Sequence, residues 1–218
     1  MNSSTTLLDD SKKLNNEKNL SKTSTREKII KTATKMISHK SYSDLSFEKV
    51  AELVLIPDRQ NKGKYKSINK ATIFHYFKTK SDLVIQIIKF RRNQILEAKE
   101  KEDSMQLNPW EKLENFIDVF KYVNVKGICP WTSLNVEINV LPTNVKEVLN
   151  EGYNFMINWL AEILTEGREI GEFNFTETAV NKGRFIWSLI QGAWLGSRLT
   201  NDYTIYDNMK EQIKSTLR

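Results

Sequence analysis

The chain has 218 residues, of which 33 are Lys or Arg, 27 are Asp or Glu and one is Cys. Hydrophobic residues make up 39%, and no apolar run approaches the roughly 18 residues that suggest a membrane span. A single Cys excludes an internal disulfide framework, and the first 20 residues lack the apolar segment of a secretion signal. We therefore expect a cytoplasmic protein of one large or two small domains.

Positive charge is concentrated in the first third of the chain. Residues 1–80 hold 17 Lys or Arg against 8 Asp or Glu, whereas residues 81–218 hold 16 against 19. A basic segment on a mildly acidic body suggests that the first third meets a polyanion. A basic solubilising surface without any partner would give the same counts, and charge alone does not separate the two.

The predicted elements are helices, and no segment has the alternation of a convincing β-strand. Residues 1–22 are polar and rich in Ser, Asn and Lys, which predicts a flexible arm. Thr25 and Ser46 stand where helix N-caps are expected, and Pro57 would end the second helix. The first third then predicts three helices and, before the third, a polar and basic loop: helices over 26–38, 46–55 and 68–77, and the loop over 57–67.

The rest of the chain predicts six more helices. Ser81 is the candidate N-cap of a long helix that ends near Asp103, and Pro109 begins the next one, where its missing N–H costs nothing. The helix over 177–200 is apolar on nearly every side, which indicates a core on one side and a partner subunit on the other. The remaining helices are expected over about 130–140, 142–168 and 203–217.

The three N-terminal helices have the order of a helix-turn-helix unit. Ile68, Ile73 and Phe77 would anchor the third helix on the first two. Its exposed face would then carry side chains that can contact phosphates or bases, namely Lys70, Thr72, Phe74, His75 and Tyr76.

The segment "INKATIFHYFKTKSDL" resembles the recognition-helix segment of the tetracycline-repressor (TetR) family, whose usual form is close to V-S-K-G-T-L-Y-H-Y-F-K-S-K-E-E-L. The earlier "TREKIIKTATKMISHKSYSDLSFEKVAE" also resembles that family's opening, and "EGREIGEFNF" and "SLIQGAWLGSRLTND" resemble the ends of its ligand-domain and dimerisation helices. The resemblance covers about residues 24–200. It implies an all-α fold with a helix-turn-helix DNA-binding domain over 23–80 and a helical ligand-binding and dimerisation domain over 81–218.

The resemblance also implies roles for single residues. Thr72 and Tyr76 would donate hydroxyls to DNA phosphates, and Lys80, at the start of the fourth helix, would hold another phosphate. His75 would be a polar reader rather than a metal ligand, although a histidine merely satisfied at the surface remains the simpler alternative. Base edges in the major groove would be reached by Asn69, Lys70, Phe74 and His75.

An insertion interrupts the family pattern at about residues 56–67. Ala51 and Ile68 are 17 positions apart, where the family usually has five. Apart from Asp58, the charges of the insertion are all cations: Arg59, Lys62, Lys64 and Lys66. One interpretation is that the basic loop adds phosphate contacts. Two alternatives remain open: a solvated insert that only changes the angle between the second and third helices, and an insert that shifts the DNA site.

The body would enclose a cavity for a small, partly apolar inducer, although each bulky residue taken singly is more simply core. Cys129 precedes a helix beginning at Pro130, a position that lowers a thiol pKa, so a sensor thiolate and an inert buried thiol both remain open. The candidate lining is Phe90, Phe116, Phe120, Cys129, Trp131, Tyr153, Met156 and Trp187. Dimer contacts are expected at Trp187, Ile190, Trp194, Gly196 and Met209.

No catalytic set is visible in the sequence. One Cys and two His give no zinc spacing, and there is no Gly-rich phosphate loop or nucleophile elbow. We therefore expect a homodimeric regulator without enzymatic activity, metal or cofactor, most simply a repressor that a small-molecule inducer releases from a double-stranded DNA operator. The alternative is a helical interaction protein of the same fold that binds a protein partner, and a small-molecule enzyme comes third.

Overall fold

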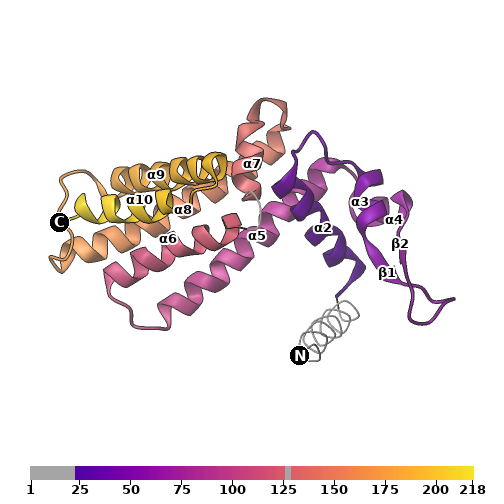
Figure 1. The fold of residues 1–218 in the computed structure, drawn as a ribbon, viewed down its shortest axis with the longest axis horizontal. Coiled ribbons are helices and arrows are strands. Elements are labelled where there is room, and N and C mark those ends of the chain that lie inside the picture. The colour runs from indigo at the N-terminus through magenta and orange to yellow at the C-terminus, as the bar shows by residue number, and fades with distance from the viewer. Residues whose placement is uncertain (1–22, 126–128) are drawn as a thin grey trace, which may run out of the picture. The chain divides into compact units, whose positions relative to one another are not determined.

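The computed structural model describes residues 23–125 and 129–218, so the predicted arm over residues 1–22 lies outside the described residues (Figure 1). The chain divides into two compact units, the first ending at Ile87 and the second beginning at Ile88. Helix α5 (Lys80–Asp103) is continuous and contributes to both units. The all-α class is confirmed apart from one small sheet, and no helix in the described residues is long and apolar enough to cross a membrane.

Three short helices make up most of the first unit. Ser24 rather than Thr25 is the first N-cap, because its side-chain oxygen accepts a hydrogen bond from the Glu27 backbone N–H at 3.2 Å. Ser46 caps the second helix as predicted, accepting from the Lys49 N–H at 3.2 Å. The helices are α2 (Thr25–His39), α3 (Phe47–Leu53) and α4 (Lys70–Tyr76).

A single apolar core joins these helices. Five side chains in it have no exposed surface, namely Ile29, Ala33 and Ile37 of α2, Val50 of α3 and Ile73 of α4. Burying a Val or Ile side chain stabilises a fold by about 1.5–3 kcal/mol. Each helix contacts the other two, so all three depend on the same core.

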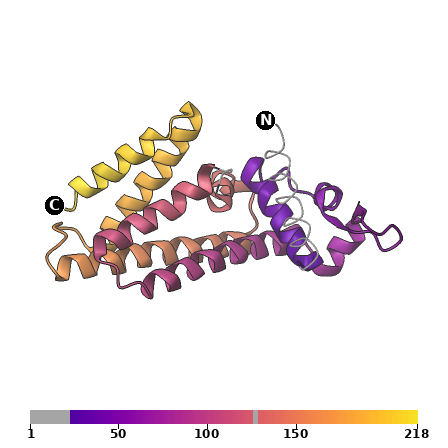
Figure 2. The ribbon, with the colours of Figure 1, turned by 60° about the horizontal axis from the view of Figure 1, so that its bottom comes forward.

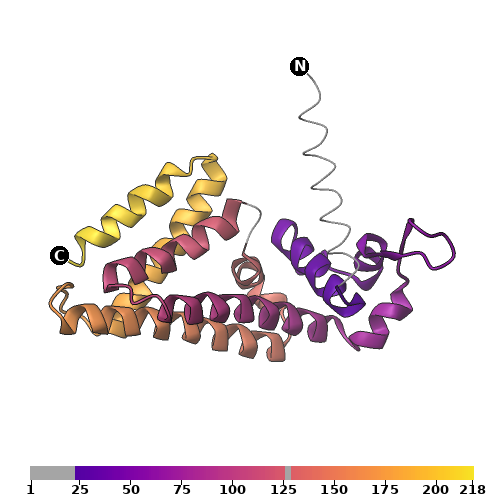
Figure 3. The same ribbon diagram turned by 90° about the horizontal axis from the view of Figure 1, so that it is seen from below.

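A β-hairpin lies between α3 and α4, where the sequence predicted a longer helix followed by a loop. Helix α3 ends at Leu53, and Val54 is already extended, with φ −83° and ψ 113°. Strands β1 (Leu55–Pro57) and β2 (Tyr65–Ser67) pair antiparallel, and the loop between them extends away from α3 and α4 (Figure 3). The helix prediction to residue 55 was wrong because Val54 and Leu55 are engaged by the hairpin: the Val54 carbonyl oxygen accepts from the Ile68 N–H at 3.2 Å, and Leu55 is paired with Ser67.

The N-cap of α5 is Thr79 and not the predicted Ser81. The Thr79 hydroxyl oxygen accepts from the Asp82 backbone N–H at 3.1 Å, and the Asp82 carboxylate accepts from the Thr79 N–H at 2.9 Å. This reciprocal pair satisfies two donors at the start of the helix. It makes Lys80 the first helical residue.

The second unit is a bundle of helices. Helix α8 (Thr143–Glu169) packs on α6 (Pro109–Val125) and α9 (Ala179–Thr200), and α10 (Thr204–Ser215) packs on α9 and α6 (Figure 2). The predicted helix over 130–140 divides into α7 (Pro130–Val136) and a 3₁₀ turn over Ile138–Val140. The second half of α5 contacts α8, for example through the ion pair of Lys99 and Glu162 at 3.3 Å.

Three of the predicted dimer contacts belong to this unit's own core. Ile190 has no exposed surface, Trp194 is 4% exposed and Met209 is 7% exposed. A side chain already covered by its own chain has almost no area left to bury against a second copy. Their assignment to a dimer interface was therefore wrong; helical periodicity identified an apolar face, but not the α8 and α10 neighbours that cover it.

Candidate nucleic-acid interface and ligand cavity

Helix α4 is held by one face and exposed on the other. Ile68, Ile73 and Phe77 are 8%, 0% and 2% exposed, so the three predicted anchors are all buried. Lys70, His75 and Tyr76 are exposed. The sequence therefore places a polar and aromatic surface opposite a fixed apolar one.

Asn69 is the N-cap of α4. Its Oδ1 atom accepts hydrogen bonds from both the backbone N–H and the hydroxyl of Thr72, each at 2.8 Å. The carbonyl oxygen of this side chain is thus engaged within the helix rather than free for a base edge. The Thr72 hydroxyl would have to leave Asn69 before it could donate to a phosphate.

Lys70 and Phe74 are both engaged with α3. The Phe74 ring meets the Phe47 ring edge-to-face with centroids 4.9 Å apart, and Lys70 Nζ forms an ion pair with Glu48 and lies 5.4 Å from the Phe74 ring centroid. The hydrogen bond from Lys70 lowers the pKa of the exposed Glu48 carboxyl. An approaching phosphate would compete with Glu48 for Lys70.

His75 and Tyr76 continue the exposed surface, and Lys80 is half-buried. The His75 and Tyr76 rings meet edge-to-face with centroids 5.1 Å apart. Lys80 Nζ lies 4.0 Å from the ring centroid of Tyr42, a cation–π contact that orients the ammonium group. The predicted DNA-contacting set therefore lies on α4 and the first residue of α5, with Asn69 serving mainly as a cap.

The hairpin carries the other predicted phosphate contacts. Arg59, Lys62 and Lys64 are exposed, and none of them makes an ion pair with another of the described residues. Lys66 differs, because its Nζ lies 3.2 Å from the carboxylate of Asp58. Hydrogen bonds from Asn61, from the Gln60 backbone N–H and from Lys66 lower the pKa of that carboxyl.

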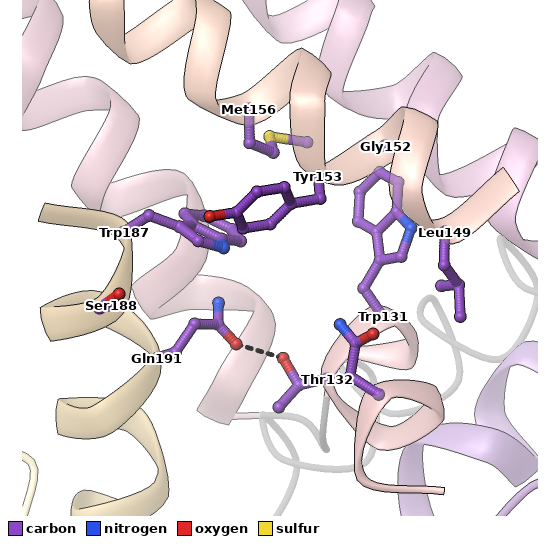
Figure 4. A pocket seen from close by; sticks show the side chains of 10 residues that line it. Trp131, Thr132, Leu149, Gly152, Tyr153, Met156, Trp187, Ser188 and Gln191 are labelled. Carbon is purple, nitrogen blue, oxygen red and sulfur yellow. Dashed lines mark hydrogen bonds between the residues drawn. The ribbon is translucent and has the colours of Figure 1, made fainter. Parts of the chain in front are cut away.

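A cavity of about 340 Å³ lies within the second unit, between α7, α8 and α9 (Figure 4). Its walls are three aromatic rings with aliphatic and neutral polar groups. No charged side chain is among them. The lining consists of Trp131, Thr132, Asn135, Leu149, Gly152, Tyr153, Met156, Trp187, Ser188 and Gln191.

Half of the predicted lining lies at this cavity, namely Trp131, Tyr153, Met156 and Trp187. Phe90 and Cys129 are not part of its wall. Phe116 and Phe120 are also absent from the wall; they pack behind Trp187, with ring centroids 6.1 and 4.9 Å from it. These two belong to the core that supports the wall.

Sequence analysis missed the polar part of the wall because it counted only bulky residues. Thr132 donates its hydroxyl hydrogen to Gln191 Oε1 at 2.5 Å and so joins α7 to α9. Gly152 lets the Trp131 ring approach α8, since a Cβ atom there would lie 2.5 Å from Trp131 Cζ2. A usable signal was present: polar residues stand one helical turn from Trp131 and Trp187, in Trp131–Asn135 and Trp187–Gln191.

The Cys129 thiol is buried, and burial raises its pKa, although the charge of Arg91 acts in the opposite direction. The expectation of a lowered pKa is thus contradicted. The short helix that Cys129 precedes does not offset the loss of water around a thiolate. The structure favours the alternative of an inert buried thiol.

Comparisons with known proteins give a family match within the second unit and a fold for the chain. Residues 110–213 match the family model described as "Tetracyclin repressor-like, C-terminal domain". No curated protein sequence is significantly similar to the chain. The fold is shared with several solved transcriptional regulators.

Three of these illustrate the likeness. A TetR transcriptional regulator from Legionella pneumophila has a TM-score of 0.76 at 22% identity, covering 90% of this chain and 98% of that one. Reduced NemR from E. coli has a TM-score of 0.74 at 16% sequence identity, and the match covers 89% of this chain and 98% of that one. FadR from Bacillus subtilis, solved in complex with stearoyl-CoA, has a TM-score of 0.68 at 21% sequence identity, and the match covers 88% of this chain and 98% of that one.

Replacing Asn69 by Ala is expected to lower the free energy of unfolding by about 1 kcal/mol, because that is the typical cost of losing an N-cap acceptor. Asn69→Ser is the matched control, since a serine hydroxyl can accept the same hydrogen bond from the Thr72 N–H. Chemical denaturation followed by circular dichroism gives both values. Equal stability of the alanine variant and the wild type would contradict the capping role and leave Asn69 available for DNA.

Proposed function

We infer that this chain is a member of the tetracycline-repressor (TetR) family and a DNA-binding transcriptional regulator that responds to a small molecule. The observation that supports this most strongly is the exposed face of α4, which displays Lys70, His75 and Tyr76 beside buried anchors. A cavity in the second unit supplies a place for the small molecule. We propose that the regulator is a repressor, that it works in the cytoplasm and that it acts by binding rather than by catalysis.

On DNA, α4 would enter the major groove. His75, Lys70 and Phe74 would face base edges, while the Tyr76 hydroxyl and Lys80 would contact phosphates on either side. Thr72 joins the phosphate contacts only by exchanging its bond to Asn69. Lys70 likewise exchanges Glu48 for DNA, a change favoured by the density of negative charge along the duplex.

The proposed regulator is a homodimer that uses the outer face of α9. Phe185, Leu195 and Leu199 are 45%, 48% and 87% exposed there, at a spacing that places them on one side of the helix. Gly192 lies between them, and a Cβ atom at this position would meet nothing within 4 Å. An exposed apolar stripe with a small residue at its centre suits close contact with the same helix of a second copy.

Ligand control follows from a shift between two populations of the dimer. Two recognition helices must lie about one DNA turn, roughly 34–36 Å, apart to dock together. Helix α5 is common to both units and contacts α8, which forms one wall of the cavity. A ligand that favours a different position of α5 would change the separation of the two α4 helices and release the operator.

The rival function is a helical interaction protein whose basic first unit binds a protein partner. The hairpin between α3 and α4 is the observation that favours it, because the family that the sequence resembles usually has only a short turn there. Weak DNA binding without sequence preference would support this rival.

The test compares binding of the protein to the DNA that flanks its own gene with binding to a scrambled duplex. Fluorescence anisotropy at two salt concentrations should show a preference for the native duplex that survives moderate salt. His75→Ala should reduce that preference about 5- to 150-fold, the effect of about 1–3 kcal/mol expected for a base contact. His39→Ala is the matched control: His39 is an exposed histidine of the same unit, bonded to the Lys35 carbonyl oxygen, and it should leave the preference unchanged.

Two results would contradict the proposal. Equal and salt-sensitive binding to the native duplex, the scrambled duplex and further genomic fragments would favour the protein-binding rival. A wild-type preference that His75→Ala and His39→Ala leave equally intact would remove α4 from the reading surface.

A further inference from the structure

We propose that the β1–β2 hairpin is a second DNA-contacting element, which binds phosphates beside the site of α4. The inference rests on the proposed DNA-binding function and adds a second contact to that of α4. It starts from how the hairpin is attached, how little of it is buried and where its charges lie.

The hairpin is fixed at its base by hydrogen bonds between the end of α3 and the residues that precede α4. The Ile68 N–H donates to the Val54 carbonyl oxygen at 3.2 Å, and the Ser67 hydroxyl donates to the Glu52 carbonyl oxygen at 3.1 Å. Strand β2 ends at Ser67, and α4 begins three positions later at Lys70. Any surface displayed by the hairpin is thus held in a set place relative to α4.

Apolar burial does not account for the hairpin. Among the six strand residues, Ile56 is half-buried and the other five are exposed. The exposed fraction is 45% for Leu55 and 36% for Tyr65. A two-stranded hairpin without a covered face is marginally stable in water. A projecting element with this little core is more readily explained by what it contacts than by packing within the unit.

The only acid of the hairpin is directed inward. Asp58 accepts hydrogen bonds from the Gln60 N–H at 3.1 Å and the Asn61 side chain at 2.8 Å, pairs with Lys66 at 3.2 Å, and donates its own N–H to the Lys64 carbonyl oxygen at 2.8 Å. These contacts close the tip loop. The other three cations of the hairpin make no ion pair with another described residue. They are Arg59, Lys62 and Lys64, and they are exposed at and beside the tip.

The dimensions suit a phosphate contact. At about 3.3 Å per residue, the tip lies up to about 20 Å from the base of the hairpin, more than half of one DNA turn. Exposed Lys and Arg on such an arm can meet a phosphate outside the segment read by α4. Phosphate contacts strengthen binding and set orientation but carry no sequence information, so the hairpin should add affinity rather than specificity.

The test compares two double variants of the full-length protein. Lys62→Ala/Lys64→Ala removes two exposed lysines of the hairpin, and Lys89→Ala/Lys101→Ala removes two exposed lysines of α5 with the same change in net charge. The slope of log affinity against log salt should become shallower by about 1.8 units per bound protomer in the hairpin variant, at about 0.9 per phosphate contact. The control should keep the wild-type slope, and the ratio of native to scrambled affinity should stay the same in all three.

An unchanged slope in the hairpin variant, or equal losses in both variants, would overturn the proposal. Slopes are measured on the scrambled duplex as well as on the native one. If the wild type shows no sequence preference, the proposed regulatory function fails, but the slopes still decide whether the hairpin touches phosphates.

A second inference concerns the cavity and rests on different residues. We propose that it accepts a small, uncharged, planar molecule with a hydrogen-bond acceptor. The rings of Trp131, Tyr153 and Trp187 supply flat apolar walls, and no charged side chain is present to offset the burial of an ionised group. A volume of about 340 Å³ suits a small aromatic compound.

Gln191 supplies the direction of the polar contact. Its Oε1 atom is occupied by the Thr132 hydroxyl at 2.5 Å, which fixes the amide so that its nitrogen faces the aromatic side chains (Figure 4). Thr132 is buried and Gln191 is half-buried, so this hydrogen bond lies partly out of contact with water. The amide N–H groups are then donors for an acceptor atom of the ligand.

Three probes of similar size separate the features: acetophenone, which is neutral with an acceptor, ethylbenzene, which lacks one, and benzoate, which is charged. Equilibrium dialysis without DNA should show acetophenone binding about 3- to 10-fold more tightly than ethylbenzene, as expected for one hydrogen bond, and benzoate binding weakest. Gln191→Leu should abolish the advantage of acetophenone while retaining ethylbenzene.

Binding of none of the three probes, equal binding of acetophenone and ethylbenzene, or an advantage that survives Gln191→Leu would overturn this assignment. Because DNA is absent, these outcomes are independent of whether the protein reads an operator.

Discussion

The reading surface depends on the burial of one face of a helix that is too short to stand alone. Isolated helices of fewer than about 12–15 residues are marginal in water, and α4 spans only Lys70–Tyr76. Its position is set by Ile73 and Phe77 in the core and by the cap at Asn69. Because the opposite face of α4 is buried, His75 and Tyr76 point toward solvent. The same buried contacts hold the end of the hairpin that leads into α4.

In the proposed function, DNA binding and ligand binding would be linked through the residues that follow α4. Phe77 is buried, Thr79 caps α5 two residues later, and α5 then continues into the second unit, where Lys99 pairs with Glu162 of α8. Helix α8 also carries Tyr153 and Met156 into the cavity wall. A ligand in the cavity would act on DNA binding by biasing the position of α5, so the contacts between α5 and α8 would matter as much as the ligand contacts.

Helical periodicity predicted the helices well because most of them bury one continuous face. It could not predict the hairpin: both of its strands are three residues long and largely exposed, so no alternation marks them. Nor could it tell which neighbour covers an apolar face, which is why Ile190 and Trp194 were placed at a dimer contact. In the cavity, Trp131 and Trp187 were found from their bulk, whereas Thr132 and Gln191 owe their role to a contact across 59 positions.

In the proposed function, two copies of α4 dock together on one face of a DNA duplex. Hydroxyl-radical footprinting of the protein on genomic fragments selected by binding tests this arrangement. We expect two protected patches of equal size on the same face, with centres about one helical turn, roughly 10 base pairs, apart. A single patch, or weak and even protection along every fragment, would contradict it.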